Sequence, residues 1–152
     1  MTALVLASVL AWQGNAAITS DPAYKELSRL VGGHWENAAG SPFKVVNRFR
    51  FEVGGTLIRS DGKVTQNGKA VLYMHANLGW DKATKSVFYV DLHNNDTVYT
   101  GHVALVEGTL VYDFGELHNP KAHYSIKMKF IDDDHYEGQG GGEDLKMTRV
   151  KD

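Results

Sequence analysis

Short runs in which apolar and polar residues alternate, each ended by a turn signal, make up nearly the whole chain after residue 33. The segment 123–131 is the clearest of these runs, with large side chains at every second position: Tyr124, Ile126, Met128 and Phe130. A period of two is the pattern of a β-strand that buries one face. About ten such segments follow one another, and no stretch between them is long enough for the crossover that parallel strands need. The sequence therefore predicts an all-β fold built as an antiparallel meander.

Two residues at opposite ends of this meander indicate that it closes into a barrel. Trp35 follows Gly33 in the first predicted strand, and Arg149 lies in the last one, 145–150. An Arg guanidinium stacked on an indole can seal the seam between the first and last strands. An immunoglobulin-type sandwich would instead carry a pair of cysteines, and the chain has none. We therefore expect a single antiparallel up-and-down β-barrel of about ten strands.

Turn residues and alternation also predict which side chains face the interior of this barrel. Glycine-containing dipeptides predict turns between strands, among them Gly54-Gly55, Asp61-Gly62 and Asn67-Gly68. In the segment before these turns, the alternation places one set of side chains inside: Val45, Asn47, Phe49 and Phe51. Arg48 and Arg50 then face solvent, because a shift of the register by one residue would bury both charges.

One short helix is predicted ahead of the barrel, from Asp21 to Val31. Asp21 can cap the free N–H groups of the first turn, Pro22 fits the first helical position, and Gly32 ends the helix. A chain of 152 residues has room for one domain with one core. We therefore expect residues 18–152 to form a single barrel domain, with the helix covering one of its mouths.

Residues 1–17 have the pattern of a secretory signal peptide. The ten-residue run from Ala3 to Trp12, apolar except for Ser8, fits the hydrophobic region of such a peptide and is too short to span a bilayer. Because no Lys or Arg precedes this run, a non-exported apolar arm is the alternative. The pattern predicts a periplasmic or secreted protein.

Composition argues against several classes of function. Lys and Arg are scattered and the formal net charge is −2, so the chain lacks the basic stripe of a nucleic-acid-binding protein. Without cysteine, thiolate metal sites and a Cys nucleophile are excluded. The seven histidines show none of the spacings of zinc motifs. We expect no metal, no cofactor, no nucleic-acid partner and no membrane span, while the sequence does not indicate an oligomeric state.

Two motifs resemble those of the calycin superfamily, which comprises the lipocalins, the fatty-acid-binding proteins and their relatives. The first is the Gly33-x-Trp35 opening together with Arg149 in the last predicted strand. The second, LGWDKATKSVF at 78–88, is similar to the Gly-Tyr-Asp hairpin of an uncharacterised lipocalin-like bacterial family, with Trp80 where that family often has Tyr. The resemblance covers roughly residues 24–150 and implies a barrel that holds a small hydrophobic ligand. The glycine-rich run that follows the Trp in haem-binding nitrobindins is absent after Trp35.

Four residues are candidates for acid/base chemistry: His75, Asp91, His102 and Tyr112. Each histidine lies within a predicted strand, so on an inward face either could act as a general base. Alternation places Asp91 on one face with Tyr89 and His93, a set that can exchange protons with a bound substrate. For the two histidines and for Asp91, we favour the simpler interpretation of a solvent-facing or purely structural position.

Aromatic residues are too numerous on the predicted inner faces for all of them to face solvent. They either fill the barrel or line a cavity, and we favour a cavity because ten strands leave more room than the eight of barrels that side chains just fill. Its expected lining combines aromatic residues with one amide and one thioether: Asn47, Phe49, Phe51, Tyr112, Phe114, Tyr124 and Met128.

Three hypotheses for function remain open on this basis. The leading one is a barrel that binds a small hydrophobic or amphipathic molecule and performs no chemistry. The alternative is a barrel enzyme, an isomerase, cyclase or lyase, that acts on a sequestered hydrophobic substrate. The third is an interaction module with a filled interior. Several titratable side chains converging in a deep cavity would favour the enzyme, a single polar anchor the binding protein, and a filled barrel the module.

Overall fold

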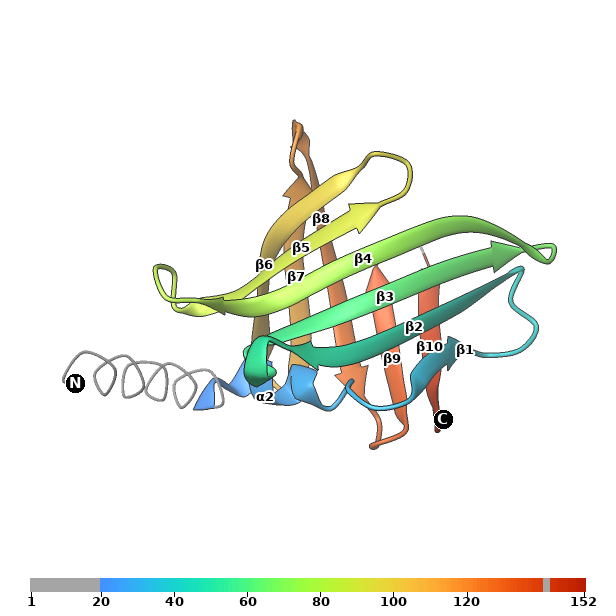
Figure 1. The fold of residues 1–152 in the computed structure, drawn as a ribbon, viewed down its shortest axis with the longest axis horizontal. Helices are drawn as coiled ribbons and strands as arrows, with labels where there is room; N and C mark the ends of the chain where they lie inside the picture. Colours follow the sequence, from blue (N-terminus) through green and yellow to red (C-terminus); the bar gives the residue numbers. More distant parts are fainter. Residues whose placement is uncertain (1–19, 141–142) are drawn as a thin grey trace, which may run out of the picture.

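The computed structural model describes residues 20–140 and 143–152, which form a closed antiparallel β-barrel (Figure 1). The segment 1–17, with its predicted signal peptide, lies outside the described residues. The barrel has ten strands: β1 (His34–Asn37), β2 (Phe43–Glu52), β3 (Leu57–Gln66), β4 (Lys69–Asp81), β5 (Ser86–His93), β6 (Val98–Val106), β7 (Thr109–Glu116), β8 (Asn119–Phe130), β9 (His135–Gly140) and β10 (Glu143–Val150). The predicted all-β class, the antiparallel topology and the barrel closure are confirmed.

The barrel closes at β1, which pairs with both β2 and β10. Trp35 lies opposite Asn47 on one side and opposite Arg149 on the other. Every other strand pairs with its neighbours in sequence, as hairpin connections dictate. Closure gives every strand a neighbour on both sides, although some pairings are short: β8 pairs with β9 only from Lys127 to Phe130.

The seam between β1 and β10 carries the aromatic and cationic contact expected from the sequence. The guanidinium carbon of Arg149 lies 4.4 Å from the ring centroid of Trp35, and the indole N–H donates to the carbonyl oxygen of Leu30 at 2.8 Å. The guanidinium also donates to four backbone carbonyl oxygens, those of Arg29, Val31, Gly32 and Asp133. One side chain thus joins the last strand to the segment after the helix and to the β8–β9 turn.

The only described α-helix, α2 (Pro22–Ser28), lies across one end of the barrel (Figure 1). It is shorter than predicted, because the residues after Ser28 continue as a turn rather than as helix. The side chain of Asp21 accepts a hydrogen bond from the N–H of Tyr24 at 2.9 Å, which is the predicted cap. The Tyr24 hydroxyl donates to the carbonyl oxygen of Gly55 at 2.6 Å, in the short 3-10 turn η1 (Val53–Gly55) between β2 and β3. Within the described residues, no helix is long and apolar enough to cross a membrane.

The end of the barrel beside α2 is solidly packed. The side chains there are almost wholly buried and come from the helix segment and from six strands: Leu27, Leu30, Trp35, Ile58, Leu78, Val87, Val103 and Leu110. Burial of one such aliphatic side chain contributes roughly 1.5–3 kcal/mol. These buried side chains, called the plug below, explain why so short a helix is held in place, since α2 supplies apolar side chains to a core that the strands build.

One predicted turn is wrong, because Asp61-Gly62 lies in the middle of β3. Gly62 faces the interior between Asn47 on β2 and Met74 on β4. A Cβ atom at Gly62 would lie 2.6 Å from Oδ1 of Asn47 and 2.8 Å from Cε of Met74. The glycine is therefore required by side chains from the two neighbouring strands, and a strand glycine of this kind has the same sequence signature as a turn.

Candidate functional site

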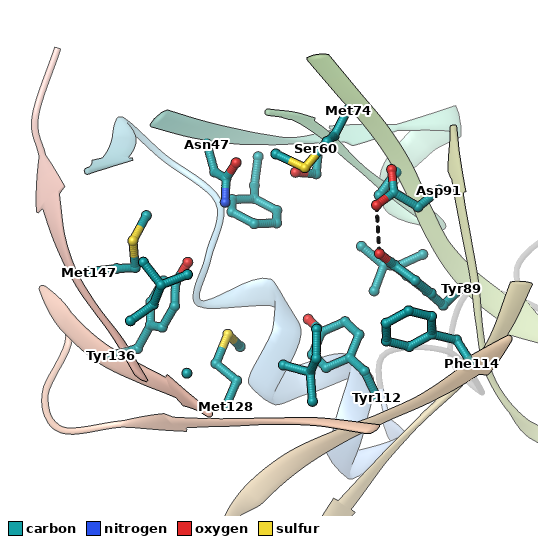
Figure 2. Close-up of a pocket in the computed structure, with 16 residues that line it drawn as sticks. Asn47, Ser60, Met74, Tyr89, Asp91, Tyr112, Phe114, Met128, Tyr136 and Met147 are labelled. Atoms are coloured by element: carbon teal, nitrogen blue, oxygen red, sulfur yellow. Dashed lines mark hydrogen bonds between the residues drawn. The ribbon is translucent and has the colours of Figure 1, made fainter. Parts of the chain in front are cut away.

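The half of the interior away from α2 contains a cavity of about 200 Å³ (Figure 2). Aliphatic, thioether and aromatic side chains make up most of its wall, among them Phe49, Ala76, Leu78, Phe114, Ile126, Met128 and Met147. The polar groups of the wall are those of Asn47, Ser60, Tyr89, Asp91, Tyr112 and Tyr136. The cavity is thus mostly apolar with a few polar side chains, as is usual for sites that bind small molecules.

Five of the seven residues predicted to bind a ligand line this cavity: Asn47, Phe49, Tyr112, Phe114 and Met128. The other two, Phe51 and Tyr124, do not line it and are 46% and 41% exposed. Both have the parity of the inner face, but Phe51 lies near the end of β2 and Tyr124 in the outer part of β8. Tyr124 stacks on Phe114 with ring centroids 5.6 Å apart. Alternation predicts the face of a strand and not the depth at which a side chain lies.

Asp91 is buried in the cavity wall, so the favoured solvent-facing interpretation is wrong. It is 6% exposed. Its Oδ2 accepts a hydrogen bond from the Tyr89 hydroxyl at 2.7 Å and lies 3.0 Å from Nε2 of His93. Its other carboxyl oxygen, Oδ1, is buried and has no hydrogen-bond partner among the described residues. The three residues named from the sequence as a possible acid/base set therefore do meet inside the barrel.

The outer face of β5 explains why the sequence pointed the other way. That face carries the apolar residues Phe88, Val90 and Leu92, and Leu92 is 45% exposed. The inner face carries the polar residues Tyr89, Asp91 and His93. In a strand that lines a cavity the usual polarity of the two faces can be inverted, because the inner wall must meet a ligand rather than fill a core.

The two candidate histidines lie on the outside of the barrel. His75 has a half-exposed side chain, and its Nδ1 lies 2.6 Å from Oδ1 of Asp61. Burial opposes the ionisation of Asp61, but the hydrogen bonds from His75 and Arg50 together outweigh this effect and lower its pKa. His102 is exposed, with Nδ1 3.0 Å from Oγ of Ser86. Neither imidazole can act on a molecule inside the barrel.

Three phenol groups in the cavity wall stay protonated over the usual pH range. Burial raises the pKa of Tyr112 and of Tyr136, and burial together with the neighbouring Asp91 carboxylate raises the pKa of Tyr89. The hydroxyls of Tyr112 and Tyr136 point into the cavity in Figure 2. The Asn47 amide acts against burial on the pKa of Tyr136 without offsetting it, so the polar residue expected on this inner face has a polar neighbour. These phenols act as neutral hydrogen-bonding groups.

Phe114 of the cavity wall belongs to a group of aromatic rings at the end of the barrel opposite α2. An aromatic cluster of His93, Tyr99, Phe114 and Tyr124 lies there, with neighbouring ring centroids 4.9–5.8 Å apart. At the other end, the plug of fully buried side chains separates the cavity from α2. The helix therefore covers the packed end of the barrel and not the cavity itself.

Comparison with known proteins adds no assignment, because no family model and no curated protein matches this chain. The closed ten-stranded antiparallel barrel is consistent with a calycin-like fold. In residues 20–140 and 143–152, no group of three or more His, Cys, Asp or Glu side chains is placed to hold a metal ion.

Proposed function

We propose that this protein is a calycin-like barrel that binds a small, largely apolar molecule in its interior. The observation that carries the proposal is the cavity of about 200 Å³, with apolar walls and a few polar side chains directed into it. We also propose, from the pattern of residues 1–17, that binding takes place in the periplasm or outside the cell.

The volume of the cavity limits the size of the ligand. An apolar cavity of about 150 Å³ holds one benzene molecule, so this one accommodates about eight or nine non-hydrogen atoms. A long-chain fatty acid has about twice that number, and most of its chain would remain outside the cavity. Burial of about 150 Å² of apolar ligand surface provides roughly 4 kcal/mol before the cost of association. A generic ligand of this size therefore binds with a dissociation constant no better than about 1 mM.

Acetophenone is a suitable probe because it is soluble and of the right size. Three of the four methionines line the cavity (Met74, Met128 and Met147), so their ¹³C-labelled methyl groups report on binding by NMR. We expect saturable shifts of these signals, and an increase in the unfolding free energy of about 1.4 kcal/mol at ten times the dissociation constant.

Two alanines make a matched pair of variants for this experiment. Ala76 is buried and lines the cavity, whereas Ala104 is exposed on the outer face. We expect Ala76→Phe to abolish binding by filling the cavity and Ala104→Phe to bind like the unchanged protein. Unchanged binding in a folded Ala76→Phe variant, or no binding by the unchanged protein, would refute the proposal.

A second candidate, an acid/base enzyme, is favoured because Tyr89 and Asp91 of the cavity wall meet His93, which contacts Asp91. Asp91 could remove a proton from a carbon next to a carbonyl group and return it to the same carbon. Acetophenone in D₂O tests this, because such transfer exchanges its methyl protons for deuterons. Exchange faster than in buffer, and lost in Asp91→Asn, would support the enzyme; exchange at the buffer rate would exclude this reaction for the probe.

A further inference from the structure

We infer that the cavity selects molecules that carry a hydroxyl or amino group, and that Asp91 accepts a hydrogen bond from that group. This inference rests on the proposed binding function and narrows the class of ligand. It follows from the half-satisfied carboxyl group of Asp91, from the residues around it, and from the absence of cationic side chains in the described cavity wall.

The carboxyl group of Asp91 is satisfied on one side only. The contacts of Tyr89 and His93 are both made to Oδ2, at 2.7 and 3.0 Å. Oδ1 has no partner, although the side chain is only 9% exposed. Buried polar atoms are almost always hydrogen-bonded, and an ionised oxygen without a donor is among the most unfavourable exceptions. The described chain supplies no donor to Oδ1, so this acceptor is open to a donor from a bound molecule.

The surroundings of Asp91 leave room for such a molecule. Asp91 lies opposite Ala76 on β4. Apart from Gly138, which has no side chain, Ala76 is the smallest residue of the cavity wall. Met74 lies two residues before Ala76 on the same inner face, diagonally across from Asp91 (Figure 2). Its thioether side chain has several accessible rotamers of similar energy. The Met74 methyl group lies toward Gly62 on β3, so the small side chain of Ala76 and the mobility of Met74 together make room for a ligand to reach Oδ1.

The charges of the cavity exclude an anionic ligand group at this position. No Lys or Arg occurs among the described residues that line the cavity. The nearest group that could carry a positive charge, His93, already contacts Oδ2. A ligand carboxylate beside Asp91 would meet a like charge where water cannot screen it. A hydroxyl donates one hydrogen bond to Oδ1, and an ammonium group adds charge complementarity.

Four probes of nearly equal size separate these possibilities: 1-phenylethanol, 1-phenylethylamine, acetophenone and benzoate. The alcohol and the amine can donate a hydrogen bond, acetophenone can only accept one, and benzoate carries a negative charge. With the methionine methyl signals as the readout, we expect the donors to bind at least tenfold more tightly than acetophenone, and benzoate to bind most weakly. The amine compared with the alcohol shows whether a positive charge is preferred.

The variant Asp91→Asn tests whether Asp91 sets this order. An Asn side chain can keep an acceptor oxygen toward Tyr89 while it presents an N–H₂ donor in place of Oδ1. We expect the preference to reverse, so that acetophenone binds at least as tightly as 1-phenylethanol. Asp113→Asn is the matched control, because Asp113 lies on the outer face with a 64% exposed side chain that contacts His123. This control should keep the original order.

The outcomes separate this inference from the proposed function. Similar affinities for the alcohol, the amine and acetophenone would overturn the donor preference and leave the binding function standing. A donor preference that persists in Asp91→Asn would also overturn it, since the acceptor would then be another group. If no probe binds, the proposed function itself fails. If Asp91→Asn does not fold, two measurements on the unchanged protein test the inference: the order of affinities, and nuclear Overhauser contacts from the bound alcohol to the Met74 methyl group. The inference is overturned if the donors are not preferred or if these contacts are not observed.

Discussion

Arg149 holds the seam between β1 and β10 together, so we expect its replacement to lower the stability of the barrel strongly. Its side chain is 12% exposed and donates to the carbonyl oxygens of Arg29, Val31, Gly32 and Asp133. The replacement Arg149→Met keeps an unbranched side chain of similar reach but leaves these acceptors without a donor. It also removes the cation from the face of Trp35.

The expected loss follows from these contacts. The cation–π contact contributes about 0.5–2 kcal/mol, and hydrogen bonds from a charged donor about 1.5 kcal/mol or more before overlap among them is considered. Because the four carbonyls share one guanidinium and some regain water, we expect a total loss of about 3–4 kcal/mol. For a chain of this length the melting temperature should fall by about 10 °C.

The loss is measured as the change in the free energy of unfolding, from denaturation with guanidinium chloride followed by circular dichroism. Arg48→Met is the matched control, because the Arg48 side chain is 54% exposed and makes one ion pair, with Asp152, at 3.1 Å. The control should lose less than about 0.5 kcal/mol. Arg149→Lys should be intermediate, since an ammonium group keeps the charge but cannot reach all four carbonyls. The reasoning fails if Arg149→Met is within about 1 kcal/mol of the control.

Three further predictions concern other parts of the molecule. Gly101→Ala should destabilise the protein by about 2 kcal/mol, because the new Cβ would lie 2.1 Å from the carbonyl oxygen of Asp113 on the paired strand; Gly138→Ala, with its nearest neighbour 3.9 Å away, should be nearly neutral in the same unfolding assay. The lowered pKa of Asp61 means that its contribution to stability is present above the unfolded value of about 4 and is lost as the pH falls through the lower folded value. Asp61→Asn should flatten this acid limb of a stability-against-pH curve, and an unchanged limb would contradict the assignment. Protein exported by a Gram-negative host should begin near Ile18 by mass spectrometry; an intact Met1 on soluble, folded protein would rule out the proposed signal peptide.

The wall of the barrel was largely predictable from local sequence. Each strand pleat places successive side chains on opposite faces, so a period of two identified the strands and the inward parity of Asn47 and Phe49 without any knowledge of their partners. Paired Asn67 and Gly68 identified a hairpin, since both adopt the positive φ that such a turn requires. Trp35 and Arg149 could be paired across the whole chain only because a closed meander must join its first and last strands.

The contents of the barrel depended on tertiary structure. Phe49 and Phe51 have the same parity, yet only Phe49 lines the cavity, because depth depends on where the whole strand lies in the barrel. Gly62 has the signature of a turn and lies in a strand, since Asn47 and Met74 occupy the space of its missing side chain. Asp91 looked solvent-facing because the outer face of its strand is the apolar one. Alternation along one strand separates its two faces but does not show which face the barrel encloses. The enclosed face is decided by the neighbouring strands, and by whether the space inside is filled with side chains or left for a ligand.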